Sequence, residues 1–226
     1  TVLKGKLREN MKNGRLRKAL VVLQFSISII LMTGTIIMVR QIRYMLNKDL
    51  GFNKEQLMVI THAEAVGDHV KAFKEDLAGI REVVKVSAST AVPGHSESGK
   101  TYVVEGKTGD VMDFKVNYID YDFFDTYGIL LSSGRVFNES FTTDNNAGII
   151  NESTVRQLNL SDPFTTNLVD GYERVSIVGV VRNFNFESLH RDIDPYIFRT
   201  KNSNNNYGYI SLRLSTGATA KTIKEI

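Results

Sequence analysis

The sequence predicts an α+β protein in which an N-terminal transmembrane helix and stalk precede a larger α/β domain outside the cytoplasm. Three observations predict this class. Residues 19–39 carry no charged side chain, basic residues are concentrated before them, and patterns typical of strands and helices alternate from about residue 52 onward. The order β-α-β, then strands with short helices, then strands and a final helix indicates an α+β domain that carries a smaller inserted subdomain.

The apolar run at 19–39 reads ALVVLQFSISIILMTGTIIMV. A helix of this length spans about 31 Å, which matches the hydrocarbon core of a bilayer. A core helix of a soluble protein usually keeps a polar face, and this run is apolar on most sides. A cleaved signal peptide has a shorter apolar region that ends at small residues, and no such cleavage pattern follows. The run therefore predicts a membrane-spanning helix.

Basic residues predict the orientation of this helix. Residues 1–18 hold seven Lys or Arg and one acid, Glu9, whereas Arg40, Arg43 and Lys48 follow the run. Because positive charge favours the cytoplasmic side, we expect residues 1–18 in the cytoplasm and everything after about residue 45 outside it. The other 208 residues carry 21 basic and 24 acidic groups, so the outer domain lacks the basic excess of a nucleic-acid-binding protein.

Apolar spacing continues beyond the membrane and predicts a helical stalk at 40–51 that stops at Gly51, a residue typical just beyond a helix end. Within the span, a semi-polar stripe recurs with helical spacing and consists of Gln24, Ser28, Leu31 and Thr35. It reflects either the tolerance of small polar residues or a face packed against other membrane helices, and we favour packing.

The outer domain, 52–226, shows alternating strand and helix signals. Strands are predicted at 56–62, 83–90, 101–106, 113–121, 172–181, 195–200 and 207–214, and the stretch 147–154 is predicted as a short strand that runs into a helix. A helix at 67–80 lies between the first two strands and forms a β-α-β unit with them. Short helices are predicted within 120–129, ended by Gly128, and after 151, capped by Asn151 or Ser153. The final residues from 217 look like a helix cut off in its second turn, and the chain starts without methionine, so we interpret it as an excerpt of a longer protein.

The stretch GHSESGKT at 94–101 matches the letters of a phosphate-binding loop, G-x-x-x-x-G-K-[ST]. Such a loop requires a helix directly after Lys100 and Thr101, because the helix N-terminus holds the phosphates. The residues that follow, YVVEGKTGD, are instead typical of a strand and a turn. We therefore interpret the stretch as a flexible connection within the outer domain and expect no bound nucleotide.

The remaining candidate sites lack necessary partners. Glu187 and His190 form one E-x-x-H, with Asp192 and Asp194 nearby, but a di-metal site needs two such helices. The four histidines, His62, His69, His95 and His190, share no metal-ligand spacing. The chain has no cysteine, no G-x-S-x-G serine and no apolar-flanked carboxylate pair. We expect no catalytic residue, no cofactor and no metal site, and we therefore expect that the chain is not an enzyme.

Four stretches together resemble one family. They lie at 16–60, 116–137 (VNYIDYDFFDTYGILLSSGRVF), 148–158 (GIINESTVRQL) and 177–198 (IVGVVRNFNFESLHRDIDPYIF), and they are similar to MacB/FtsX-type ABC transporter permeases. The resemblance implies a periplasmic core domain at 52–226 with a porter-like α/β part and a smaller inserted subdomain at about 121–184. Residues 1–18 look like the link into the second half of a duplicated permease, and three more membrane helices would follow residue 226.

The resemblance also implies a function. ATP hydrolysed by a separate cytoplasmic ABC ATPase subunit would move the periplasmic domain mechanically, for export or extrusion from the periplasm. The implied partners are that ATPase, the lipid bilayer, a second permease half or copy, and a periplasmic adaptor, and the implied location is the bacterial inner membrane. The residues of interest would be the membrane helix, residues 40–50 of the stalk and the FESLH region at 186–190.

Two other function classes stay open. A single helix that joins an outer domain to a cytoplasmic kinase would make the chain the extracytoplasmic sensor of a signalling receptor. Such a receptor would show one further membrane helix and then a signalling domain, whereas a permease would show three further apolar runs. A membrane-tethered enzyme is disfavoured by the absence of a recognisable active site.

Overall fold

The computed structural model describes residues 2–95, 98–106, 111–171, 173–186, 192–200 and 206–218, with side chains from residue 14 onward except that of residue 98. The chain divides into two compact units, Thr1–Lys48 and Asp49–Ile226.

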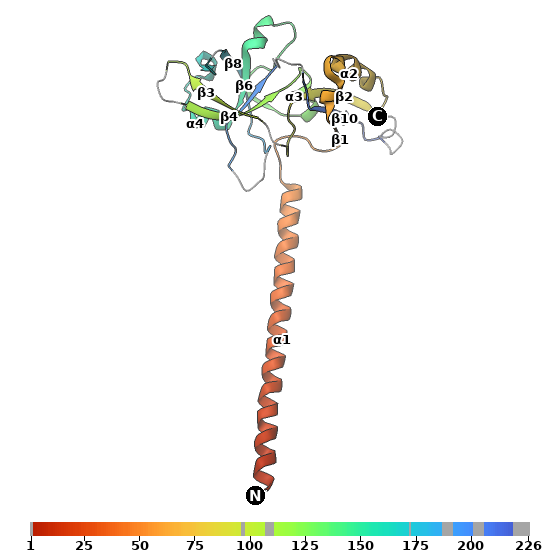
Figure 1. The fold of residues 1–226 in the computed structure, drawn as a ribbon, viewed down its shortest axis with the longest axis vertical. Helices are drawn as coiled ribbons and strands as arrows, with labels where there is room; N and C mark the ends of the chain where they lie inside the picture. The colour runs from red at the N-terminus through yellow and green to blue at the C-terminus, as the bar shows by residue number, and fades with distance from the viewer. Residues whose placement is uncertain are drawn as a thin grey trace. The chain divides into compact units, whose positions relative to one another are not determined.

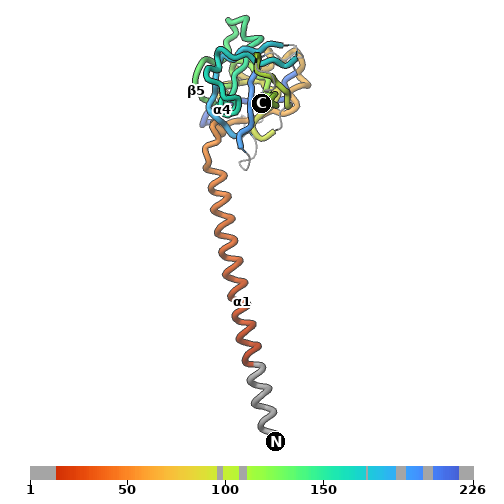
Figure 2. The backbone as a smooth tube through the Cα atoms, turned by 90° about the vertical axis from the view of Figure 1, so that its left-hand side faces the viewer, coloured from red at the N-terminus to blue at the C-terminus, as the bar shows by residue number. Residues whose placement is uncertain are grey.

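The first unit is one helix, α1 (Val2–Asn47), and Figure 2 shows its coloured part as a continuous coil. Its part Gly14–Asn47 is long and apolar enough to cross a membrane. Residues 2–18 and 19–39 of the predicted segments and most of the predicted stalk thus belong to a single helix. The predicted end at Gly51 is wrong, because α1 ends at Asn47. The Asp49 carboxylate accepts the Gly51 N–H at 2.9 Å, and this local turn competes with continued helix.

Hydroxyl groups within α1 are satisfied by its own backbone. Ser28 donates to the Gln24 carbonyl at 2.9 Å, and Thr35 donates to the Leu31 carbonyl at 2.8 Å. Both bonds run between members of the predicted semi-polar stripe. In a bilayer these bonds remove the cost of two unpaired hydroxyls. The packing of this stripe against other membrane helices stays a prediction.

The second unit contains a small antiparallel sheet with the order β1-β10-β2 (Figure 1). Its strands are β1 (Leu57–Thr61), β2 (Val83–Ser89) and β10 (Tyr209–Leu214). Helix α2 (Val70–Ala78), preceded by the 3-10 turn η1 (Ala63–His69), packs on one face. The predicted β-α-β unit is present, but its strands are not neighbours, because the distant strand β10 lies between them. This is a split β-α-β arrangement.

A seven-stranded sheet forms the larger part of this unit, with the order β5-β8-β6-β9-β4-β3-β7. Its strands are β3 (Ser98–Val104), β4 (Val111–Tyr118), β5 (Leu131–Gly134), β6 (Ala147–Asn151), β7 (Asn167–Val169), β8 (Arg174–Val181) and β9 (Tyr196–Arg199). Because β7 pairs with both β3 and β8, six strands close into a ring. A cluster with side chains from all six strands fills it.

Two strands, β5 and β7, were not predicted from the sequence. Both are short, and β5 reads LSSG, which is typical of a loop. The inserted subdomain at about 121–184 stays a prediction: its residues supply β5 to β8, while 98–118 and 196–199 supply the other strands of the same sheet.

Short helices occupy the connections. α3 (Phe123–Tyr127) ends at Gly128 (φ 64°), as predicted. α4 (Glu152–Gln157) is capped by Asn151, whose side chain accepts the Thr154 N–H, so the structure selects Asn151 over Ser153. The 3-10 turns η2 (Thr142–Asn146) and η3 (Pro163–Thr165) complete the elements.

The connection between β5 and β6 is held by the buried carboxylate of Asp144. Arg135 donates to both of its oxygens, at 2.8 and 2.6 Å, and the Asn138 N–H donates at 2.9 Å. Burial alone would raise the pKa of Asp144, but these donors hold it below its ordinary value. Asp144 therefore stabilises the fold above its unfolded pKa of about 3.9, and this contribution is lost as the pH falls through its lower folded pKa.

We expect Asp144→Asn to lower the free energy of unfolding by about 2 kcal/mol at pH 7, because charge-assisted hydrogen bonds are lost. The difference from the wild type should shrink as the pH falls below about 4. Urea unfolding of both proteins at pH 7 and pH 3 measures this difference in stability. A difference that does not change with pH would contradict the stabilising role of the Asp144 carboxylate.

Candidate functional site: the segment that follows the membrane helix

Residues 50–55, here called the attachment segment, connect the end of α1 to β1. The Asp49 turn starts the segment, and a second turn follows in which the Glu55 N–H donates to the Asn53 side chain at 2.9 Å. Gly51 lies at φ 78°, in the left-handed region that favours glycine. These local bonds give the segment a defined path on the outer domain.

The attachment segment is bonded to residues 182–186, here called the strand-exit segment because it leaves β8. The Asn185 N–H donates to the Leu50 carbonyl at 2.7 Å. A Cβ on Gly51 would lie 2.6 Å from the Asn183 carbonyl oxygen and 2.8 Å from Phe184 Cα. The two backbones are thus so close that a side chain at position 51 has no space.

Arg213, on the central strand β10 of the small sheet, binds the other end of the attachment segment. Its guanidinium donates to the backbone carbonyls of Asn53, at 2.8 Å, and of Glu55, and its Nε donates to the Thr126 carbonyl at 3.0 Å. Thr126 lies in the last turn of α3, where exposed carbonyls favour a cation. Burial lowers the pKa of Arg213 from its ordinary value, although the group remains charged. Both sheets therefore hold the attachment segment.

We expect Arg213→Met to destabilise the outer domain by about 2 kcal/mol, since several hydrogen bonds to backbone carbonyls are lost together. Arg213→Lys should recover little, because one ammonium group cannot reproduce the guanidinium fork. Arg174→Met is the control, because Arg174 is 63% exposed in its pair with Glu105 and its loss should cost under about 1 kcal/mol. The urea unfolding midpoints of the three variants measure these losses of stability. Equal losses for Arg213→Met and Arg174→Met would contradict the role of Arg213 in holding the attachment segment.

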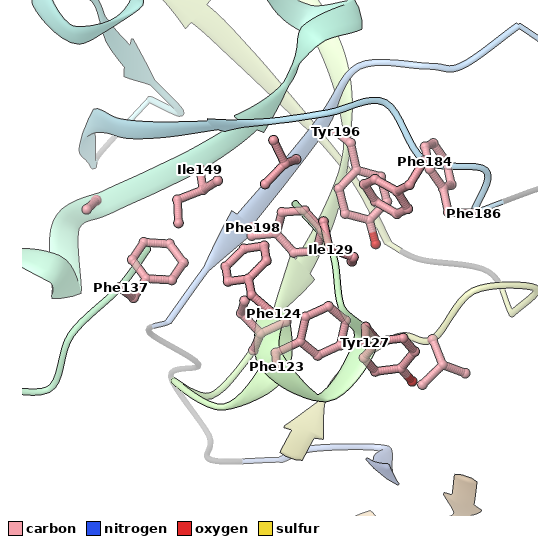
Figure 3. Close-up of a cluster of buried hydrophobic side chains, with 14 residues drawn as sticks. Phe123, Phe124, Tyr127, Ile129, Phe137, Ile149, Phe184, Phe186, Tyr196 and Phe198 are labelled. Atoms are coloured by element: carbon pink, nitrogen blue, oxygen red, sulfur yellow. The ribbon is translucent and has the colours of Figure 1, made fainter. Parts of the chain in front are cut away.

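The attachment segment also contacts an aromatic cluster of buried side chains (Figure 3). Phe52 packs against it and meets the Tyr127 ring edge-on, with centroids 6.2 Å apart. Burial raises the pKa of Tyr127 to about 12, and its hydroxyl hydrogen-bonds Ser211 of β10 at 2.7 Å. The other aromatic members are Phe123, Phe124, Phe137, Phe184, Phe186, Tyr196 and Phe198. They come from α3, β9, the strand-exit segment and the connection after β5, and Leu57, Val59 and Tyr209 of the small sheet pack against them, so the cluster joins both sheets to the attachment segment.

The phosphate-loop stretch has no helix after it. Lys100 and Thr101 lie inside β3, which starts at Ser98, and pair with Phe114 and Asp113 of β4. Lys100 forms an ion pair with Asp170. The Gly94 N–H donates to the Phe186 carbonyl at 2.8 Å. The interpretation of this stretch as a flexible connection thus needs correction. Its first residue, Gly94, is hydrogen-bonded to the strand-exit segment, and its last residues belong to β3.

The other candidate ligands fall in different places. Glu187 and His190, and with them most of the FESLH region, lie outside the described residues. Asp194 is described, and its carbonyl accepts from the Asn151 side chain at 2.9 Å. His62 contacts Thr61, and the ring of His95 lies near Tyr209. Among the described residues, no group of three or more His, Asp or Glu is placed to bind a metal ion.

A groove of about 610 Å³ runs along α2 and is lined by charged residues of both signs. Lys74 bridges Asp120 and Asp122 within it, the latter at 3.0 Å. Burial raises the pKa of Asp120 although Lys74 opposes this. The ion pair links α2 to the connection between β4 and α3.

Sequence reasoning missed the central residues of the attachment. Gly51 was noticed as a helix end, but its contact with the strand-exit segment depends on a residue more than 130 positions away. Arg213 lies in the predicted strand at 207–214 and was not singled out there. The resemblance at 177–198 did include the strand-exit segment, without indicating what it contacts.

Comparison with known proteins agrees with this architecture. The family model of the MacB-like periplasmic core domain matches residues 19–226. The periplasmic region of MacB from Actinobacillus actinomycetemcomitans is similar in structure (TM-score 0.55, 14% identity, 80% of this chain and 84% of that chain covered). So is a domain of a permease-like protein from Porphyromonas gingivalis (TM-score 0.54, 19% identity, 76% and 80% covered).

A third similar structure is the extracellular domain of the noncanonic ABC-type transporter YknZ from Gram-positive bacteria (TM-score 0.50, 19% identity, 74% and 78% covered). At these identities the structures support the fold. A search of curated proteins found no match.

Proposed function

We propose a mechanical role for this chain, which belongs to the family of MacB-like periplasmic core domains: it is the outer domain and first membrane helix of an ABC transporter permease. A separate cytoplasmic ATPase would hydrolyse ATP, and the resulting movement would reach the outer domain through the stalk. The movement would serve export or extrusion from the periplasm. We assign no enzymatic activity to the chain itself.

One observation supports this role most directly. The residues that follow the membrane helix are not a free linker, because Asn185 binds Leu50 and Arg213 binds Asn53 and Glu55. Phe52 also packs against the cluster shared by both sheets. A force applied at residue 50 is therefore opposed by backbone hydrogen bonds and core packing, as a mechanical connection requires.

The proposed surroundings follow from the family and the helix. Residues 19–39 would cross the bacterial inner membrane, with residues 1–18 in the cytoplasm and the domain after about residue 45 in the periplasm. We propose an ABC ATPase subunit, a second permease copy or half, and a periplasmic adaptor as partners. The semi-polar stripe of α1 would face other helices of the permease.

A distance measurement in the full permease with its ATPase tests this role. The chain has no cysteine, so Val111→Cys, at a position 61% exposed, places one spin label on the outer domain of each copy in an otherwise cysteine-free permease. We expect the label-to-label distance in proteoliposomes to change when ATP is hydrolysed. An ATPase variant that binds but does not hydrolyse ATP is the control. Unchanged distances during turnover would overturn the mechanical role.

A further inference from the structure

We propose that Asn183 couples the attachment segment to the first turn of α4, so that the contacts of Asn183 carry a displacement at residues 50–51 to the seven-stranded sheet. Its functional meaning rests on the mechanical role proposed above. The coupling itself is a property of the folded chain and can be measured without the ATPase.

The backbone of Asn183 is one side of this connection. Gly51 packs against its carbonyl oxygen and against Phe184, with no space for a side chain. Two residues further on, the Asn185 N–H donates to the Leu50 carbonyl at 2.7 Å. The strand-exit segment therefore has to follow any shift of residues 50 and 51, or this hydrogen bond breaks.

The other side of the connection is formed by the Asn183 side chain and N–H. Its Oδ1 accepts the Ser153 N–H at 2.9 Å, and its own N–H donates to a Glu152 carboxylate oxygen at 3.2 Å. The second Glu152 oxygen accepts from the Ser132 hydroxyl of β5 at 2.8 Å. The first N–H groups of a helix lack partners within that helix, so Asn183 satisfies a donor that α4 cannot satisfy itself.

The first turn of α4 in turn holds the chain that enters β9. The Asn151 side chain caps Thr154 and donates to the Asp194 carbonyl at 2.9 Å. The Ser153 hydroxyl donates to the Ile193 carbonyl at 2.6 Å. The contacts therefore run without interruption from Gly51 through Asn183 and Ser153 to the start of β9, a central strand of the sheet.

Hydrogen exchange of the chain in detergent micelles tests the coupling. We expect Asn183→Ala to raise exchange about 10-fold both at residues 152–158 and at residues 50–53, because one lost side chain loosens both ends. Asn185→Ala is the matched control: it leaves the backbone N–H that binds Leu50, and no hydrogen bond to its side chain is found in the described part of the chain. In Asn185→Ala, the amides of residues 50–53 and 152–158 should exchange at the wild-type rates.

If Asn183→Ala raises the exchange rate only at residues 152–158, the proposal is overturned, since Asn183 would then act only as a local cap of α4. If Asn183→Ala does not fold, the wild type provides the test. As urea rises below the denaturing range, the opening free energies of the Asn185 and Ser153 amides should become equal, because both amides exchange through the same opening. Opening free energies that stay different would overturn the coupling. If the exchange is coupled but the spin-label distances do not change during ATP hydrolysis, the mechanical role is refuted and the coupling stands. If the distances change but the exchange is not coupled, the coupling is refuted and the mechanical role stands.

Discussion

Gly51→Ala is expected to lower the free energy of unfolding of the outer domain by about 2–4 kcal/mol. About 1–2 kcal/mol comes from placing a side chain at positive φ. The rest comes from the new Cβ, which would lie 2.6 Å from the Asn183 carbonyl oxygen and 2.8 Å from Phe184 Cα. These neighbours are backbone atoms and cannot rotate away, so the two segments must separate. Urea unfolding of the chain in detergent measures the change.

Gly171→Ala is the matched control for this prediction. Gly171 has φ 88°, close to the 78° of Gly51, but a Cβ there would meet nothing within 4 Å. It should therefore cost about 1–2 kcal/mol, the conformational part alone. If both variants lose the same stability, the close contact of Gly51 with the strand-exit segment contributes nothing to the free energy of unfolding, and the mechanical connection would then rest on the hydrogen bonds of Asn185 and Arg213 and on the packing of Phe52.

Phe198→Ala is expected to have the largest effect, a loss of about 3–5 kcal/mol. Phe198 is fully buried on β9, and its ring lies between those of Tyr196, Phe124 and Phe184, with centroid distances of 4.8, 5.0 and 5.5 Å. Truncation removes these ring contacts and leaves a cavity that the surrounding strands can fill only in part. For a domain of this size, the loss corresponds to a fall in melting temperature of about 6–20 °C.

Phe141→Ala provides the comparison for Phe198→Ala. Phe141 is 48% exposed, and its main contact is the Arg135 guanidinium, 4.6 Å from the ring centroid. We expect a loss of about 1 kcal/mol or less. A Phe198→Ala loss no larger than this would show that the aromatic cluster does not join the two sheets as described.

Several predictions from sequence are confirmed because they depend on neighbouring residues. Gly128 ends α3 and Asn151 caps α4, and both effects act within one helical turn. The helix at 19–39 is likewise confirmed as part of α1, since its composition alone decides it. The short strand β5 was missed because its LSSG residues become extended only by pairing with β8.

The sequence by itself determined the long apolar helix, most strands of an α+β domain and the family resemblance, while the orientation of the helix in a membrane stays a prediction. The helix and the strands follow from composition, periodicity or short-range turn chemistry, and the resemblance rests on the order of the matching stretches. Only the tertiary structure decided that β10 lies between β1 and β2, that β7 closes the ring, and that residues 50–55 are bonded to Asn185 and Arg213. The physical reason is that strand pairing and backbone hydrogen bonds between distant segments depend on how the folded chain brings them together, and the local residue pattern carries no record of that partner.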